Sequence, residues 1–297
     1  MTYEEFQGSV IGTLAKRFPK DTSIQIHKVI KTNDRELDGI VISEPNSQIS
    51  PTIYLNPFFE AFERGASSFD EIIDTIFKAY DHHRNTETFD TEDFIRFERA
   101  RDKIVFRLIN REKNEKLLSD VPFMPYLDLA VTFSFLVDLK GEGLGAILIH
   151  NAHMEEWGKK KEELYEAAAS NVKRLLPPAL TPMNEIMKSV GIIDQNELDA
   201  YEKSPLYVLT NEKRNYGAAT ILYKDELMKA AKKLKTDRLC IIPSSVHEVL
   251  LMPEEIARCR EDIDEMVREV NSATVPPDEV LSDHAYYYDA SKDSITF

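Results

Sequence analysis

The chain has 297 residues, of which 42% are hydrophobic and 30% charged, a composition that excludes disordered and fibrous proteins. Lysine and arginine number 37 against 52 aspartates and glutamates, so the net charge of −15 repels phosphate backbones and argues against nucleic-acid binding. Two cysteines, Cys240 and Cys259, exclude a disulfide framework. The first residues lack the basic start and apolar stretch of a secretory signal, so we expect a soluble, cytoplasmic protein.

The first 85 residues carry helical and strand patterns in turn. Apolar residues at helical spacing predict helices at residues 2–17, 57–62 and 69–80. Alternating apolar and polar residues predict strands at residues 23–30, 37–42 and 51–55. These elements are sufficient to bury a core, which indicates an N-terminal module.

The middle of the chain is less regular. Residues 86–121 are charged, and the pattern at 103–110 fits either a strand or a helix. Residues 126–139 and 144–150 predict a second hairpin, followed by helices at 159–176 and 182–190 and a helical connector to residue 201. The apolar run at 127–139 is interrupted by aspartates and falls short of the roughly 20 residues of a membrane span, so we expect no membrane association.

After Pro205 the pattern becomes rich in strands. Strands are predicted at 206–210, 218–223, 239–242, 246–251, 285–288 and 294–297. Helices are predicted at 224–234 and, starting with Pro253, at 253–270. We therefore predict an α+β protein: an N-terminal helix and three-stranded sheet module at 1–85, a charged connector at 86–121, and a larger mixed α+β domain at 122–297 with hairpins, a central sheet between 205 and 253, and a long acidic helix.

Two motifs invite a cofactor or metal interpretation. Residues Gly141 to Ala146 match the G-x-G-x-x-A pattern, but the following residues form a strand where a dinucleotide site needs a helix, which favours a hairpin turn. His150 and His153 lie where a strand ends, but no further ligands at metal-site spacing accompany them. Surface histidines are the favoured interpretation, a metal site is the weaker alternative, and we expect no cofactor.

The most specific polar run is set in an apolar strand. Ser244, Ser245, His247 and Glu248 lie within 241–251 and are the candidate catalytic residues. Residues two apart on a strand lie roughly 6 to 7 Å apart, so Ser245 and His247 cannot simply pair, and Asp283 or Glu248 would have to orient the imidazole. The competing interpretation is a buried histidine that fixes the packing of two elements.

The loop at 211–217 offers binding residues. Asn211, Arg214 and Tyr216 supply an amide, a guanidinium and a ring, and Asp283 and His284 complete the candidate binding set. A plain hairpin turn, with positive φ at Asn215 and Gly217, is the alternative.

Several stretches carry a resemblance. They are Leu37-Asp38-Gly39-Ile40, Ser50-Pro51-Thr52-Ile53-Tyr54-Leu55-Asn56, Tyr207-Val208-Leu209-Thr210-Asn211, Tyr216-Gly217-Ala218, the run Ile242 to Leu250, and Ser282-Asp283-His284 with Tyr288-Asp289. Together they resemble an uncharacterised family, a domain of unknown function seen chiefly in anaerobic gut bacteria of the Firmicutes type, over nearly the whole chain. The second half is remotely similar to another uncharacterised Firmicutes family with a Pro-Ser-Ser-x-His-Glu strand. Neither resemblance implies an activity, cofactor or catalytic residue.

Two functional hypotheses follow. The first is a non-catalytic cytosolic protein that binds an unknown small molecule or protein partner, because no complete catalytic constellation is present. The second is a hydrolase with His247 as general base and Ser244 or Ser245 beside it. The sequence sets neither the ligand nor the oligomeric state.

Overall fold

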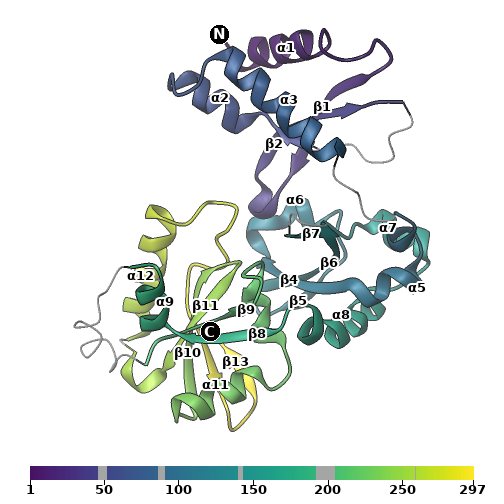
Figure 1. Ribbon diagram of the computed structural model, residues 1–297. Helices are drawn as coiled ribbons and strands as arrows, with labels where there is room; N and C mark the ends of the chain where they lie inside the picture. The colour runs from purple at the N-terminus through teal and green to yellow at the C-terminus, as the bar shows by residue number, and fades with distance from the viewer. Residues whose placement is uncertain (46–51, 86–90, 140–142, 192–204, 258) are drawn as a thin grey trace. The chain divides into compact units, whose positions relative to one another are not determined.

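The chain forms two compact units of helices and antiparallel sheets. The structure, a computed structural model, describes residues 1–45, 52–85, 91–139, 143–191, 205–257 and 259–297 (Figure 1). The first unit comprises Met1–Lys31, Arg35–Asp90 and Asp138–Gly143, and the second comprises Thr32–Asp34, Thr91–Val137 and Leu144–Phe297. The predicted α+β class, beginning with a helix and a three-stranded sheet, is confirmed.

The first unit begins with a capped helix. At the start of α1 (Tyr3–Leu14), Thr2 Oγ1 accepts the Glu5 N–H at 3.2 Å while the Glu5 carboxylate accepts the Thr2 N–H at 2.8 Å. The antiparallel strands follow in the order β1 (Ser23–Ile30), β2 (Glu36–Ser43) and β3 (Thr52–Tyr54). Helices α2 (Asn56–Glu63) and α3 (Phe69–Asn85) close the unit.

One face of this sheet carries the core of the first unit. The strand register pairs Ile24 with Ile42, Ile26 with Ile40, and Ile40 with Ile53, so these side chains share a face. They pack with side chains from all three helices, among them Phe6, Val10, Phe59, Ile73 and Ile76. Burial of each such side chain contributes about 1.5 to 3 kcal/mol.

A four-stranded sheet begins the second unit. Its strands are β4 (Ile104–Asn110), β5 (Met124–Tyr126), β6 (Leu129–Leu139) and β7 (Gly143–Leu148), with β4 on one edge of β6 and β5 and β7 on the other. The segment 103–110, whose period was ambiguous, is thus mostly strand. Helix α8 (Lys161–Leu175) is tied to β4, since Asn171 Nδ2 donates to the Ile104 carbonyl at 3.0 Å.

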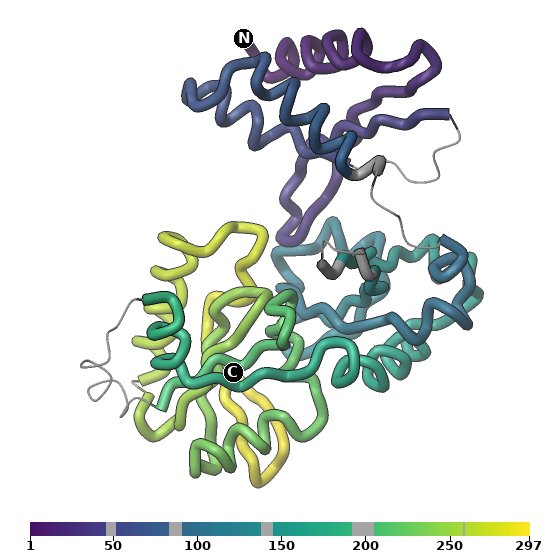
Figure 2. The backbone as a smooth tube through the Cα atoms, in the orientation of Figure 1, coloured from purple at the N-terminus to yellow at the C-terminus, as the bar shows by residue number. Residues whose placement is uncertain are grey.

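A six-stranded sheet forms the rest of the second unit. Its order is β13 (Ser294–Thr296), β12 (Tyr286–Asp289), β10 (Arg238–Ser245), β11 (Glu248–Pro253), β9 (Tyr207–Asn211) and β8 (Pro178–Pro182). Figure 2 follows the backbone from β10 in green to the C-terminal strands in yellow within this unit. The predicted sheet between 205 and 253 supplies its central strands β9, β10 and β11.

The other helices of the second unit are shorter than α8. They are η1 (Thr32–Asp34), α4 (Glu92–Ile95), α5 (Phe97–Ala100), η2 (Arg101–Lys103), η3 (Glu112–Asn114), α6 (Glu115–Leu118), α7 (Asn151–Trp157), α9 (Met183–Ser189), η4 (Gly217–Leu222), α11 (Glu226–Leu234), η5 (Glu254–Ile256) and α12 (Arg260–Ala273). None of the described helices is both long and apolar enough to cross a membrane.

Three sequence predictions of elements were wrong. Residues 218–223, expected as a strand, are mostly the buried 3₁₀ helix η4. The acidic helix starts at Arg260 instead of Pro253, because η5 follows β11 first. Strand β8 was missed, since Pro178 and Pro182 argue against a strand except at the edge position that β8 occupies.

Some predictions remain untested. The turn at 140–142 and most of the helical connector to residue 201 lie outside the described residues. Residues of the predicted charged connector form β4, whose Ile104 and Leu108 are buried in the core of the second unit. The domain boundaries at 85 and 122 stay predictions.

Candidate functional site

The hairpin of β10 and β11 holds all four candidate catalytic residues: Ser244 and Ser245 end β10, His247 lies in the turn, and Glu248 begins β11. The strand pairing shifts register between Pro243 and Ser245, which makes a bulge before the turn. The His247 N–H donates to Ser245 Oγ at 3.0 Å, and Ser244 Oγ donates to Glu248 Oε1 at 3.5 Å. Both hydroxyls therefore bond within the hairpin, and neither bonds to the imidazole.

The His247 ring is held by a neighbouring backbone. Its Nδ1 accepts the N–H of Tyr216 at 3.1 Å, so the neutral ring carries its proton on Nε2. Nε2 lies 3.6 Å from Glu279 Oε1, and the His247 side chain is 30% exposed. With Nδ1 occupied and Nε2 protonated, the imidazole in this arrangement has no free lone pair to take a proton from a hydroxyl.

The loop after β9 is shaped by Asn211. This side chain is buried, its Nδ2 donates to the Asn215 carbonyl at 2.9 Å, and its Oδ1 accepts the Lys213 N–H at 3.0 Å. The positive φ angles lie at Arg214 (51°) and Tyr216 (49°), so their prediction at Asn215 and Gly217 was wrong. The Asn211 side chain thus stabilises its own loop, and the Arg214 side chain is exposed.

Gly217 is required by close packing. A Cβ atom there would lie 2.1 Å from Thr210 Oγ1 and 2.5 Å from the His247 carbonyl oxygen. Thr210 Oγ1 itself donates to that carbonyl at 2.7 Å. The glycine therefore allows the loop to approach the His247 turn, which places Tyr216 beside the imidazole.

Tyr216 lies between two nitrogen-containing groups. Its ring centroid is 5.3 Å from that of His247 and 3.7 Å from Cζ of Arg107, which comes from β4. Burial lowers the pKa of the Arg107 guanidinium, while the interaction with Tyr216 acts in the opposite direction. Arg107 was missed from the sequence, although a single arginine inside the apolar run 104–110 was a usable signal.

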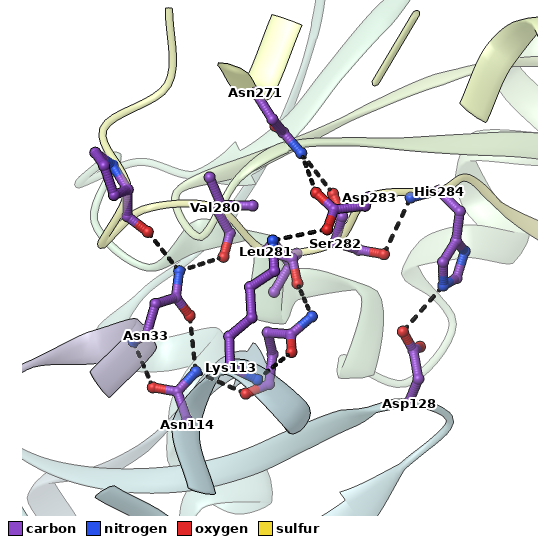
Figure 3. A network of polar contacts seen from close by, with 12 residues as sticks. Asn33, Lys113, Asn114, Asp128, Asn271, Val280, Leu281, Ser282, Asp283 and His284 are labelled. Atoms are coloured by element: carbon purple, nitrogen blue, oxygen red, sulfur yellow. Dashed lines mark hydrogen bonds and ion pairs between the residues drawn. The ribbon is translucent and has the colours of Figure 1, made fainter. Parts of the chain in front are cut away.

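His284 and Asp128 form a half-buried ion pair. His284 Nε2 lies 3.0 Å from Asp128 Oδ2 (Figure 3). Its Nδ1 lies 3.0 Å from the Ala285 carbonyl oxygen. Both partners are acceptors, so the imidazolium form satisfies both nitrogens. The hydrogen bond to Asp128 raises the pKa of His284.

Asp128 also accepts a second hydrogen bond. Tyr286 Oη donates to its Oδ1 at 2.9 Å. Burial pushes the pKa of Asp128 upward, but the hydrogen bonds from His284 and Tyr286 outweigh burial and lower it. His284 therefore holds β12 to the residues before β6 as a charged structural group.

Asp283 belongs to a network that Figure 3 shows at close range. Lys113 Nζ lies 2.7 Å from Asp283 Oδ2, and Asn271 Nδ2 donates to Asp283 Oδ1 and to the Ser282 carbonyl, both at 2.9 Å. Burial alone would raise the pKa of Asp283, but Lys113 and Asn271 lower it. Asn33 Nδ2 donates to the carbonyls of Pro277 and Val280 at 2.7 and 2.8 Å.

This network borders a pocket of about 780 Å³, which we call the Lys113 pocket. Its lining residues all belong to the second unit. They are Asn33, Lys113, Arg268, Asn271, Ser272, Ala273, Thr274, Val275, Pro276, Pro277, Val280 and Asp283. Of the candidate binding residues, the pocket contains Asp283, while Asn211, Arg214 and Tyr216 do not line it.

The histidines considered as metal ligands, His150 and His153, lie at the start of α7. His150 Nδ1 lies 2.7 Å from Asp120 Oδ2, and His153 Nδ1 accepts the His150 N–H at 3.0 Å. Burial lowers the pKa of His153. No group of three or more histidine, cysteine, aspartate or glutamate side chains suited to a metal occurs in the described part of the chain.

The predicted site residues thus form two groups in the second unit. His247 and Tyr216 are in contact, and Asp283 and His284 lie in the polar network of Figure 3. The segment after α12 links the groups, since the Val246 N–H donates to the Glu279 carbonyl at 2.8 Å. Besides Arg107, sequence reasoning missed Asn33, Lys113, Arg268 and Asn271, whose types and spacing carry no motif.

Comparison with known proteins gives a family without an activity. The model of a family of unknown function, DUF5688, matches residues 3–290. Searches of curated proteins and of solved structures found no match.

Proposed function

Because the chain belongs to the family of unknown function DUF5688, which brings no activity with it, we propose a function from the site alone. The protein is a non-catalytic binding protein, and its ligand is a small organic acid held in the Lys113 pocket. The observation that carries this proposal is the charge of the pocket: two cationic side chains and one carboxylate line it.

The charge of the pocket is opposite to that of the chain. Lys113 and Arg268 face a single carboxylate, Asp283, whereas the whole chain has a net charge of −15. Lys113 is paired with Asp283, but the exposed Arg268 has no ion pair among the described residues. A guanidinium binds a carboxylate through two parallel hydrogen bonds, so Arg268 is the group that contacts the acid.

The wall of the pocket is held in place before any ligand arrives. Asn33 fixes the carbonyls of Pro277 and Val280, and Asn271 fixes Ser282 and Asp283. The two successive prolines, 276 and 277, further restrict the backbone. A wall that is already ordered loses little entropy on binding, which favours affinity.

The size and lining of the pocket fit a small molecule. Its volume of about 780 Å³ falls within the usual range for small-molecule sites, roughly 300 to 1,000 Å³. Val275, Val280 and the prolines supply apolar contact beside the charged groups. An inorganic ion would leave most of this surface uncovered.

Calorimetric titration of the full chain with a set of small di- and tricarboxylates, including succinate and citrate, tests this function. We expect saturable binding of at least one acid, and none of succinamide, which matches succinate in shape but carries no charge. Arg268→Gln should weaken the binding at least tenfold, the loss of roughly 1.4 kcal/mol or more expected for a charged hydrogen-bonded contact.

A matched variant guards against a general charge effect. Arg96→Gln removes an exposed guanidinium from the same unit, beside Glu92, and should leave the affinity unchanged. Equal weakening by both substitutions, or binding of no acid by the wild type, would contradict the proposal.

The hydrolase remains the second candidate function. It is favoured by the partly exposed His247 ring and the carboxylate of Glu279 at 3.6 Å from Nε2, and a substrate hydroxyl or water would have to displace the Tyr216 N–H from Nδ1. Turnover of model esters that His247→Gln abolishes would establish it. Equal rates of ester turnover by the wild type and by His247→Gln would rule out the hydrolase.

Several narrower proposals rest on the sequence. A reducing, cytoplasmic location is supported by two free cysteines, Cys240 and Cys259. We also propose, on the same basis, that the family occurs chiefly in anaerobic gut bacteria of the Firmicutes type, that the second half is remotely similar to another family, and that the protein has no nucleic-acid partner. Asn211, Arg214, Tyr216 and His284 are proposed to act only by shaping the surroundings of the site.

A further inference from the structure

Strand β1 leaves one edge of the sheet in the first unit unpaired. Within the described ranges its strand partner is β2, against which all eight of its residues are in register. Just beyond β1, the Lys31 N–H donates to the Arg35 carbonyl at 2.8 Å. Hydrogen-bonded pairs alternate along an antiparallel ladder, so residues 23, 25, 27 and 29 bond to β2. The N–H and C=O groups that point away from β2 are those of Ile24, Ile26, Lys28 and Ile30.

The outward backbone groups of β1 are free to pair. No hydrogen bond joins them to any of the described residues. A row of unpaired donors and acceptors at a sheet edge is a template for another extended segment, and natural sheets usually protect such edges.

The other described sheet edges are covered, interrupted or short. Pro178 and Pro182 lie in β8 and Pro125 in β5, β7 contains two glycines, and β3 and β13 have three residues each. The edge of β4 is covered by α8, where Asn171 donates to the Ile104 carbonyl. By contrast, β1 has eight residues, no proline and no shift of register. It therefore offers the longest regular edge for an added strand.

The segment that contains β1 is basic in an acidic chain. Residues 16–31 hold five lysines and arginines against one aspartate, whereas the whole chain has a net charge of −15. The strand itself contains no carboxylate, and its Lys28 side chain is 76% exposed, with Glu36 3.9 Å away. Lys16 and Lys20 are exposed and have no ion pair with a described residue. A second copy would bring an equally basic strand to this edge, so charge complementarity favours an acidic partner.

We propose that β1 binds an extended acidic segment of another protein, which joins the sheet of the first unit as a fourth strand. The backbone of this segment pairs with the outward groups of β1, and its side chains alternate between the two faces of the sheet. Ile24 and Ile26 pack against the core of the first unit, so the added side chains on their face are apolar. Those on the opposite face, beside the exposed His27, are acidic.

Titration of the full chain into a fluorescein-labelled octapeptide that alternates glutamate and valine, followed by fluorescence anisotropy, tests the proposal. We expect saturable binding that weakens as sodium chloride is added. The matching peptide of lysine and valine should bind at least tenfold more weakly. The glutamate–valine peptide with every amide N-methylated should also bind at least tenfold more weakly, because it keeps its charge but donates no backbone hydrogen bond.

Two substitutions of Lys28 separate backbone pairing from charge. Lys28→Gln removes the charge alone, whereas Lys28→Pro also removes the outward N–H. Proline is tolerated on an edge strand where its nitrogen faces solvent, so the first unit should stay folded, as circular dichroism would show. Lys28→Pro should bind the peptide about fivefold more weakly than Lys28→Gln, the effect of one hydrogen bond. Arg268→Gln, in the Lys113 pocket, should bind the peptide as wild type does.

The proposal would be overturned if wild type did not bind the glutamate–valine peptide, or if the N-methylated peptide bound equally well. Dimerisation of the full chain in analytical ultracentrifugation that Lys28→Pro abolishes would also overturn it, since the occupant would then be a second copy. If Lys28→Pro does not fold, the N-methylated peptide decides, because that comparison leaves the protein unchanged.

Discussion

Replacement of Gly217 by alanine perturbs the contact on which the His247 turn depends. The added Cβ would lie 2.1 Å from Thr210 Oγ1, 2.5 Å from the His247 carbonyl oxygen and 2.8 Å from the Asn211 nitrogen. Two of these atoms belong to the backbone and cannot rotate away. Overpacking of this kind costs about 1 to 3 kcal/mol, and loss of the hydrogen bond from Thr210 to His247 adds about 1 kcal/mol. We expect destabilisation of about 3 kcal/mol.

Urea unfolding followed by tryptophan fluorescence measures this effect in the right unit. The chain has one tryptophan, Trp157, which lies in the second unit and donates to the Ile95 carbonyl at 3.0 Å. With a urea m-value of about 2 kcal/mol/M, the midpoint of Gly217→Ala should fall by about 1.5 M. The matched control is Gly8→Ala in α1 of the first unit, where a Cβ meets nothing within 4 Å and the Trp157 transition should not move. A midpoint for Gly217→Ala within about 0.3 M of wild type would refute the packing argument.

Three other changes test the surrounding contacts. The protonated His284 stabilises the fold fully below its ordinary pKa of 6.5, and this stabilisation is lost as the pH rises through its raised pKa in the folded protein. The ionised Asp128 stabilises the fold above its ordinary pKa of 3.8. Asp128→Asn should therefore destabilise more at pH near 5.5 than near 9 in urea unfolding, and an equal loss at both would contradict the ion pair. Ser245→Ala should cost about 1 kcal/mol, because the His247 N–H loses its acceptor, and no measurable loss would argue against that bond. Glu226→Gln should cost about 1 to 3 kcal/mol, because the Glu226 side chain is only 10% exposed and lies within 3.0 Å of two lysine ammonium groups; a neutral result would show that these pairs are fully screened.

Secondary structure was predicted best from the sequence where a segment followed a single hydrophobic period. The first hairpin was predicted within a residue at each end, because apolar residues at 24, 26, 40 and 42 alternate cleanly and the turn residues lie between them. The same rule failed at 218–223, where small and apolar residues follow Gly217 without a gap. A buried 3₁₀ helix and a buried strand give the same apolar run, so hydrophobic periodicity does not distinguish them.

The candidate site was less predictable because its parts are distant in sequence. Asn33 donates to Val280 across 247 positions, and Asp128 meets His284 across 156. Neither pair forms a motif, since the spacing that joins them is set by the fold. The polar residues near His247 were correctly singled out as unusual, but their partners Tyr216 and Glu279 come from two other segments.

The central claim, that the Lys113 pocket binds a small organic acid, is tested most directly by nuclear magnetic resonance of the pocket itself. The side-chain amide signals of Asn33 and Asn271 report on its two walls. On titration with the tightest-binding acid, both signals should shift saturably with the calorimetric dissociation constant, and in Arg268→Gln the same shifts should require at least tenfold more acid. Binding that leaves both amide signals unmoved would contradict the account.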